Sequence, residues 1–180
     1  AEVLVAREGA IVEAQRVSES EIPDVRMVAT VDLEMGDLIH LSRPSQERLG
    51  RRFALAVQGK AGPRLAEARW VSPNELWLRM TGVNGGLKAA GGRVFGFEAV
   101  VAGSQRKIFF FQASIDPANG EVVLLANRDS TERDAPEAID LWYGRGHDPI
   151  CNLTDAEDLA LPAFGPWRLP PRPAAPPRKR

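Results

Sequence analysis

The sequence predicts a mixed fold, an α/β unit at the amino end followed by an antiparallel β-sandwich. In the first sixty residues, apolar positions recur at helical spacing on both sides of one short β-branched run. Beyond residue 60, short apolar runs are separated by glycine-rich turns, which is typical of a sandwich. The chain has 180 residues, 44% hydrophobic and 26% charged, which fits an ordinary soluble globular protein that can build an apolar core.

The amino-terminal unit reads helix, strand, loop, helix. Residues 2–20 carry apolar side chains near helical spacing, with Gly9 as a mildly unfavourable interruption. Residues 25–32 form a β-branched run that indicates a buried strand of a parallel sheet. Pro44 then suits a first helical turn, and residues 45–57 carry one apolar stripe. A lone strand leaves both its edges unpaired, so we expect this unit to need more sheet from elsewhere.

The second region contains six candidate strands, at residues 68–71, 75–80, 93–101, 107–115, 121–126 and 139–143. Between the fourth and fifth, Asn119-Gly120 predicts a two-residue hairpin of type I′, because that turn needs positive φ at both central positions. Two further turns are marked by Asn84-Gly85-Gly86 and Gly91-Gly92. These signals together predict the antiparallel sandwich.

The domain boundaries follow from these changes in pattern. We expect an α/β unit over residues 1–60, the sandwich with an irregular closing segment over residues 61–168, and a proline-rich basic tail over residues 169–180. The composition of the tail favours a solvated, polyproline-like end. A docking arm for another chain is the alternative.

Composition excludes several classes of function. With 23 basic and 24 acidic side chains the net charge is -1, so we expect no nucleic-acid partner and no anionic membrane surface. No apolar run approaches the ~20 residues that span a bilayer. The single cysteine, Cys151, excludes an intrachain disulfide and a multi-cysteine zinc site, and is expected to be a buried free thiol. Secreted, periplasmic and cytoplasmic locations all remain open, since no signal peptide is recognisable at the amino end.

Residues 32–42, here called the dyad loop, follow the predicted strand and hold His40, one of only two histidines, three residues after Asp37. Open α/β sheets bind their ligands in the crevice at the carboxyl ends of their strands. Although an isolated Asp-x-x-His is common, this position favours an active site. We therefore interpret Asp37 and His40 as a candidate acid and base pair.

Three segments carry a family resemblance. The first is Asp37-Leu38-Ile39-His40 followed by Gly50-Arg51-Arg52-Phe53-Ala54, the second is Val12-Glu13-Ala14-Gln15, and the third is Tyr143 with His147-Asp148-Pro149-Ile150-Cys151-Asn152-Leu153 and Leu161-Pro162-Ala163-Phe164. In this order they resemble the Asp-x-x-His block, the preceding helix and the closing segment of the SGNH hydrolase superfamily, in particular the sialate O-acetylesterases. Arg145, Asp148 and Gly165-Pro166 depart from the closing segment of that family.

The resemblance implies a carbohydrate O-acetylesterase with a flavodoxin-like α/β/α domain. His40 would act as general base and Asp37 would orient it. In that family the Ser nucleophile and the oxyanion donors precede the Asp-x-x-His block, so we expect them on an amino-terminal chain or segment that completes the enzyme. The expected substrate is an acetylated carbohydrate such as sialic acid or a xylan unit. No cofactor and no metal are expected, and the substrate-binding residues are not identified.

Other candidates have simpler interpretations. His147 fits a loop-bracing histidine, and Ser42 and Ser45 fit the start of a helix. Asp32 and Glu34 fit a solvated acidic turn, because the ligand spacing of an EF-hand calcium loop is absent. The tryptophans are expected mainly in the core, with one at most facing a sugar, and they are Trp70, Trp77, Trp142 and Trp167. The competing function is a non-catalytic carbohydrate-binding or interaction module built on the sandwich.

Overall fold

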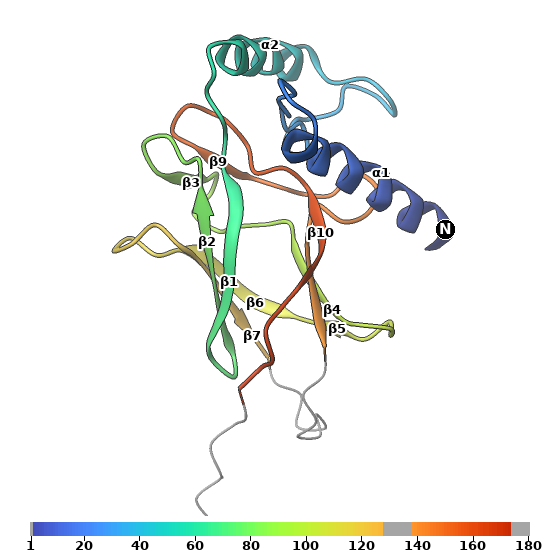
Figure 1. Cartoon of the computed structure of the whole chain (residues 1–180), viewed down its shortest axis with the longest axis vertical. Helices are drawn as coiled ribbons and strands as arrows, with labels where there is room; N and C mark the ends of the chain where they lie inside the picture. Colours follow the sequence, from blue (N-terminus) through green and yellow to red (C-terminus); the bar gives the residue numbers. More distant parts are fainter. Residues whose placement is uncertain (1, 128–137, 174–180) are drawn as a thin grey trace, which may run out of the picture.

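The structure is a computed structural model, and it describes residues 2–127 and 138–173 (Figure 1). Two α-helices, α1 (Glu2–Glu21) and α2 (Arg43–Val57), confirm the two predicted helices. Helix α2 begins where the sequence indicates, because the hydroxyl of Ser42 accepts a hydrogen bond from the amide of Ser45 and Pro44 lies in the first turn. No helix in the described ranges is long and apolar enough to cross a membrane.

The described strands form antiparallel sheets only. They are β1 (Arg64–Ser72), β2 (Glu75–Thr81), β3 (Leu87–Ala89), β4 (Phe97–Val101), β5 (Lys107–Ile108), β6 (Phe110–Ile115), β7 (Val122–Ala126), β8 (Ile139–Tyr143), β9 (Leu153–Asp155) and β10 (Phe164–Arg168). One four-stranded sheet has the order β1-β2-β7-β6, a second has the order β10-β8-β4-β5, and β3 pairs with β9. The fold is therefore a mixture of antiparallel sheets and two helices.

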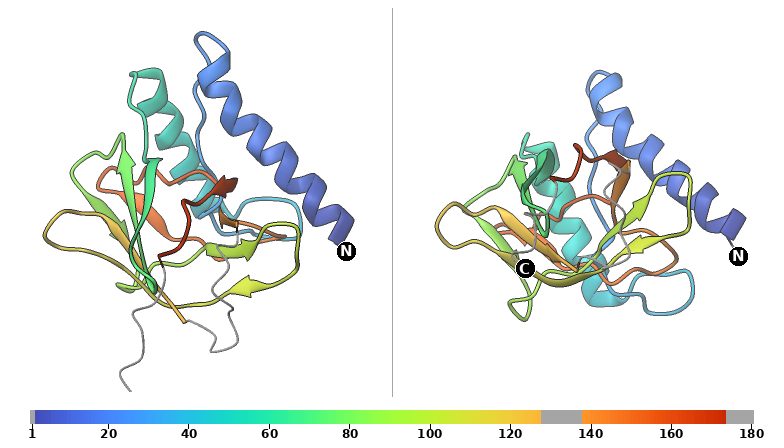
Figure 2. Two further views of the ribbon diagram at one scale, coloured as in Figure 1. Left: turned by 60° about the horizontal axis from the view of Figure 1, so that its bottom comes forward. Right: turned by 90° about the horizontal axis from the view of Figure 1, so that it is seen from below.

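The two four-stranded sheets contribute to one apolar core. Leu76, Leu78 and Leu124 come from the first sheet and Ala99 and Leu141 from the second, and all five are completely buried. Strands β7 and β8 alternate between buried and half-buried residues, as expected when one face of a sheet covers a core. Figures 1 and 2 show both helices at one end of the sheets, with α1 alongside β10.

The strand predicted at residues 25–32 is wrong as a paired strand. Residues 25–30 have no regular secondary structure, and residues 31–33 form a turn and a bend. The physical reason is the lack of a neighbour, since a β-strand exists only through a ladder of hydrogen bonds to another strand. Side chains bind part of this segment instead: Glu19 accepts a hydrogen bond from the Met27 amide at 3.0 Å, and Arg64 donates one to the Met27 carbonyl at 3.1 Å.

The predicted strands after residue 60 are found with altered bounds. The run 93–101 becomes a strand only from Phe97, and the run 107–115 is divided into β5 and β6 at Phe109. Sequence periodicity missed β3, β9 and β10, because three-residue strands carry no periodicity and β10 contains Gly165 and Pro166.

The hairpin between β6 and β7 is confirmed, but its predicted type I′ turn is wrong. Gly120 has a φ of 73°, whereas Asn119 is not among the residues with positive φ. The Gly120 amide donates to the Asp116 carbonyl, and the Asp116 amide donates to the Glu121 carbonyl, both at 2.8 Å. The connection is thus a four-residue loop in which only its last residue needs the left-handed conformation.

The tail is docked at its start, contrary to the expectation of a solvated end. Leu169 is buried, and its amide donates to the Ile139 carbonyl at 2.9 Å. Arg172 donates to the Pro73 carbonyl, and its guanidinium lies over the ring of Trp70 at 5.1 Å from the centroid. Residues 174–180 lie outside the described residues, and the division into domains at residues 60 and 168 stays a prediction.

Candidate active site

Asp37 and His40 are hydrogen-bonded to each other in the structure. Nδ1 of His40 lies 2.9 Å from Oδ2 of Asp37 and 3.2 Å from Oδ1. Oδ1 of Asp37 also accepts hydrogen bonds from the backbone amides of Ile39 and His40, each at 2.8 Å. The carboxylate is therefore held by two main-chain donors while it contacts the imidazole, an arrangement that fixes the position of the ring.

The dyad loop is a small hairpin that presents this pair at its tip. The Gly36 amide donates to the His40 carbonyl at 2.8 Å, and the Ser42 amide donates to the Glu34 carbonyl at 3.0 Å. A Cβ atom at Gly36 would lie 3.1 Å from Cα of Ser42, so the close approach of the two arms favours glycine. Since Ser42 also caps α2, the helix start and the hairpin are held by the same residue.

The pair is open to solvent. The side chain of His40 is 68% exposed and that of Asp37 is 59% exposed. The hydrogen bond from the Ile39 amide, followed by those from the His40 side chain and amide, lowers the pKa of Asp37. Asp37 is consequently a carboxylate at neutral pH, the form that can accept a hydrogen bond from a protonated Nδ1 of His40.

A second arrangement of charges lies at the base of the same loop, with Asp32 and Arg52 buried and Arg48 and Asp158 partly exposed. Arg52 binds Asp32 through two hydrogen bonds of 2.7 Å, and it also donates to the carbonyls of Ala29 at 2.8 Å and Asp158 at 2.6 Å. Arg48 reaches Asp158 at 2.5 Å and Asp32 at 3.0 Å. We call Asp32, Arg48, Arg52 and Asp158 the ion network. It ties the loop to α2 and to the segment after β9.

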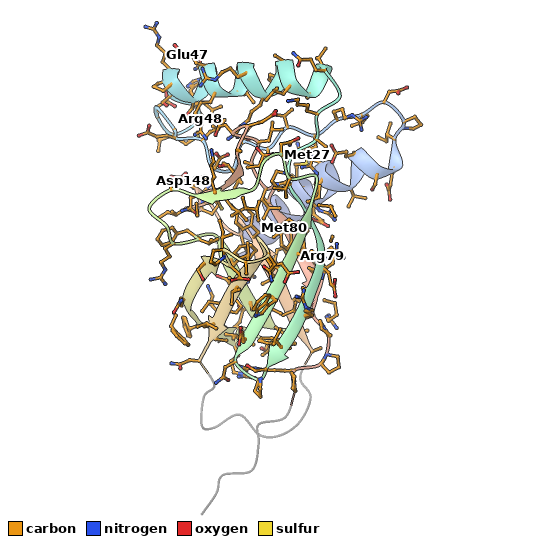
Figure 3. All side chains as sticks on the ribbon, turned by 90° about the vertical axis from the view of Figure 1, so that its left-hand side faces the viewer. Met27, Glu47, Arg48, Arg79, Met80 and Asp148 are labelled. Atoms are coloured by element: carbon orange, nitrogen blue, oxygen red, sulfur yellow. The ribbon has the colours of Figure 1, made fainter. Side chains whose placement is uncertain are left out.

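The interpretation of Asp32 as part of a solvated acidic turn is wrong. Its side chain is 3% exposed and that of Arg52 is 1% exposed. The spacing of Arg48 and Arg52 was a sequence signal for this ion pairing. Residues i and i+4 lie on one face of a helix and can contact a common carboxylate. Figure 3 shows Arg48 on the underside of α2, while Glu47 points away from the sheets.

The closing segment has structural roles. The hydroxyl of Tyr143 accepts a hydrogen bond from the Leu153 amide at 3.2 Å, and its ring packs 4.8 Å from that of Phe97. Asn152 donates to the carbonyls of Ala90 at 2.9 Å and Arg93 at 2.8 Å. The expected buried thiol is confirmed, since Cys151 is 8% exposed and burial raises its pKa to about 12. These residues join β8, β9 and the loop before β4.

The other residues considered from the sequence lie outside the pair formed by Asp37 and His40. Ser42 and Ser45 form the start of α2, with Ser42 Oγ 3.1 Å from Ser45 Oγ. His147 lies exposed in the turn after β8. All four tryptophans are half-buried, and Trp70 and Trp167 pack against the apolar core, so the expectation that most belong to the core is met by two of the four. Among the described residues, no group of three or more His, Cys, Asp or Glu side chains could hold a metal ion.

Comparison with known proteins gives partial likenesses of structure. No family model matches the chain, and no curated protein sequence matches it. A carbohydrate acetylesterase from Xanthomonas citri is 21% identical over 74% of this chain and 30% of its own, with a TM-score of 0.49. The S-layer protein SbsC is 9% identical over 71% of this chain and 16% of its own, with a TM-score of 0.44. The chain spans less than a third of either protein.

Proposed function

We propose that this chain is the carboxyl-terminal part of an SGNH-type serine esterase that removes O-acetyl groups from a carbohydrate such as sialic acid. The observation that carries the proposal is the Asp37 carboxylate, held by two amides against Nδ1 of His40. This is the geometry in which a carboxylate sets the tautomer of a general base. Asp37 and His40 are the catalytic residues of the proposal.

In the proposed reaction, Nε2 of His40 takes the proton from a serine hydroxyl as that oxygen attacks the acetyl carbonyl. Imidazole suits this step because it can gain and lose a proton near neutral pH. The carboxylate of Asp37 stabilises the imidazolium that forms, and the proton then passes to the sugar oxygen as its bond to the acetyl carbon breaks, which releases the sugar hydroxyl. Water repeats the sequence to release acetate from the serine.

The serine and the oxyanion donors are proposed to come from an amino-terminal chain or segment. The tip of the dyad loop is suited to being covered, since Leu38 is 91% and Ile39 is 77% exposed beside the exposed dyad. Exposed apolar side chains next to a candidate site favour a contact surface. Ser42, the serine nearest to His40 in sequence, is engaged in capping α2.

Residues 25–31 offer the surface on which that segment would dock. On one edge of this extended run, Glu19 and Arg64 bind Met27, and Arg52 binds the Ala29 carbonyl. Within the described ranges, no hydrogen bond reaches the backbone of Arg26 or Val28. In a strand, alternate residues direct their backbone groups to opposite edges, which would place these two residues on the other edge. The Thr30 carbonyl accepts a hydrogen bond from the Leu33 amide at 3.0 Å, so the opposite edge is open at Arg26 and Val28, where a single strand could add.

A groove of about 560 Å³ runs along the same segment. It is lined by residues 25–31, by Val12, Gln15 and Ser18 of α1, and by residues of the closing segment. A strand from the amino-terminal segment would add to the open edge and place its loop near the tip of the dyad loop. Such an occupant would pair with the predicted strand, cover the exposed apolar tip and supply the proposed nucleophile.

The test is hydrolysis of p-nitrophenyl acetate by the complete assembly of this chain with its amino-terminal segment. The assembly should be active, the chain alone inactive, and His40→Ala should lower kcat/KM by about 10³-fold or more, as expected when a general base is removed. His147→Ala is the matched control and should retain activity. An active His40→Ala assembly would exclude the proposed role.

A second function is favoured by one observation, the partial exposure of all four tryptophans. As a non-catalytic carbohydrate-binding module, residues 64–164 would bind a glycan and His40 would be dispensable. Sugars should then change the tryptophan fluorescence of the full chain, with no difference between the wild type and His40→Ala. A lack of response counts against the binding module.

A further inference from the structure

A cleft lies beside the ion network, and none of its lining residues comes from the tip of the dyad loop. Its volume is about 680 Å³, within the range of small-molecule sites. Asp32, Arg48 and Asp158 line one part, and β3 with Ala90, Gly92, Asn152 and Thr154 lines another. The catalytic roles proposed for Asp37 and His40 do not use this cleft.

The cations that line the cleft are not equally paired. The carboxylates of Asp32 and Asp158 are bound by Arg48, which lines the cleft, and by Arg52, which is buried behind it. Lys88 of β3 is exposed, and no ion pair or hydrogen bond reaches its ammonium group within the described ranges. Lys88 therefore has no carboxylate partner among the described residues, and its ammonium group is available to an anionic ligand.

The other groups in the cleft suit a ligand rich in hydroxyls. The hydroxyl of Thr154 makes no hydrogen bond with the described residues. Asp158 is 40% exposed and Arg48 is 31% exposed, so each has hydrogen-bonding capacity toward the cleft. Leu87, Ala89 and Ile115 supply apolar surface for the C–H face of a ring. Donors, acceptors and small apolar patches in one cleft match the chemistry of a sugar.

We propose that this cleft binds a carboxylate-bearing sugar unit of the glycan, with Lys88 contacting the carboxylate and Thr154 a hydroxyl. The choice of a sugar rests on the proposed function. The cleft and the dyad share the dyad loop, since Asp32 lines the cleft and Asp37 lies five residues later. Five residues span at most about 18 Å, so one extended glycan can occupy both places.

The test is binding of D-glucuronate and D-glucose to the full chain, followed by the chemical shifts of its backbone amides. Glucuronate should shift the amides of β3 and of residues 151–154, and 0.5 M salt should weaken it because charge screening acts on an open site. Lys88→Met should weaken glucuronate about tenfold and leave glucose unchanged, whereas Thr154→Val should weaken both sugars. Lys107→Met, on β5, is the control for loss of a lysine and should bind as the wild type does.

The proposal is overturned if glucuronate binds no better than glucose, if the shifted amides lie elsewhere, or if Lys88→Met and Lys107→Met bind glucuronate equally. The amide spectrum of each variant shows directly that it is folded. Because binding requires no catalysis, this experiment can fail while His40 still proves essential for hydrolysis. Conversely, an inactive assembly with intact glucuronate binding would remove the esterase proposal and leave the cleft.

Discussion

Two aspartates of the dyad loop, Asp32 and Asp37, lie within six residues of each other but in different surroundings. Asp32 lies at the buried base, where Arg52 binds both its oxygens and Arg48 adds a third contact. Asp37 lies at the exposed tip, where main-chain amides and one imidazole hold it. Removing one partner of a buried ion pair leaves an unpaired charge in the interior and lowers the stability strongly, whereas breaking an exposed ion pair costs little stability. The base therefore stabilises the fold, and the tip contributes little to stability, as the catalytic role proposed for it allows.

Loss of Arg52 should produce the largest effect. Arg52→Met leaves the carboxylate of Asp32 buried without its main partner and removes a donor from two backbone carbonyls, so we expect a destabilisation of about 3–5 kcal/mol. Urea unfolding followed by circular dichroism measures it. The neighbouring Arg51 is exposed, and Arg51→Met should change the stability by no more than about 0.5 kcal/mol. Equal effects of both variants would contradict a structural role specific to the base of the loop.

The next largest loss of stability is expected where the closing segment packs against the loop before β4. A Cβ at Gly96 would lie 2.7 Å from Cys151 Sγ and 2.7 Å from the ring of Tyr143. Gly103 has a similarly positive φ of 75° with nothing within 4 Å of the added atom. Gly96→Ala should therefore cost roughly 1–3 kcal/mol more than Gly103→Ala, measured by thermal unfolding. If the two variants unfold alike, the packing of Tyr143 and Cys151 against Gly96 is not the constraint.

The contribution of Asp158 should depend on pH. Burial acts to raise the pKa of Asp158, but the hydrogen bonds and charges of Arg48 and Arg52 outweigh it and lower the pKa. A carboxyl whose pKa is lower in the folded state stabilises the fold above its unfolded pKa, about 3.9, and this contribution is lost as the pH falls through the folded pKa. Wild type and Asp158→Asn should differ in urea midpoint at pH 7 and converge below pH 4. A constant difference would be inconsistent with this ionisation.

The smallest effect on stability is expected at the tip. His40→Ala should leave the thermal midpoint unchanged, since the side chain is largely exposed. It should raise the pKa of Asp37 only part of the way to its ordinary value, because the amide of Ile39 is the largest cause of the lowered pKa and remains. Carboxyl ¹³C NMR titration measures this value. A complete return to the ordinary value would show that the ring alone holds the carboxylate.

The sequence was sufficient for the two helices and for the contact within the dyad loop, which depend on local pattern, although the local turn at Asn119-Gly120 was assigned the wrong type. Both helices follow from apolar spacing and from Ser42 and Pro44 at the start of α2. The hydrogen bond between Asp37 and His40 also follows from a local turn, because the two residues are only three apart.

The parts that depend on distant partners were not accessible. Residues 25–32 have the composition of a strand, but pairing requires a neighbour that the pattern cannot supply. The side chain of Asp32 is buried because Arg52 binds both its oxygens, and Asp158, far along the chain, completes the network by binding Arg48. The spacing of Arg48 and Arg52 suggests a shared carboxylate, but the contribution of Asp158 appears only in the tertiary structure.

A fluorophosphonate, which reacts covalently with an activated serine, provides the most direct test of the central claim. The assembly of this chain with its amino-terminal segment is labelled, digested and analysed by mass spectrometry, beside the same assembly with His40→Ala. We predict a label on a serine outside this chain, formed much more slowly in His40→Ala. A label on Ser42 or on another serine of this chain, or an equal labelling rate without His40, would contradict the account.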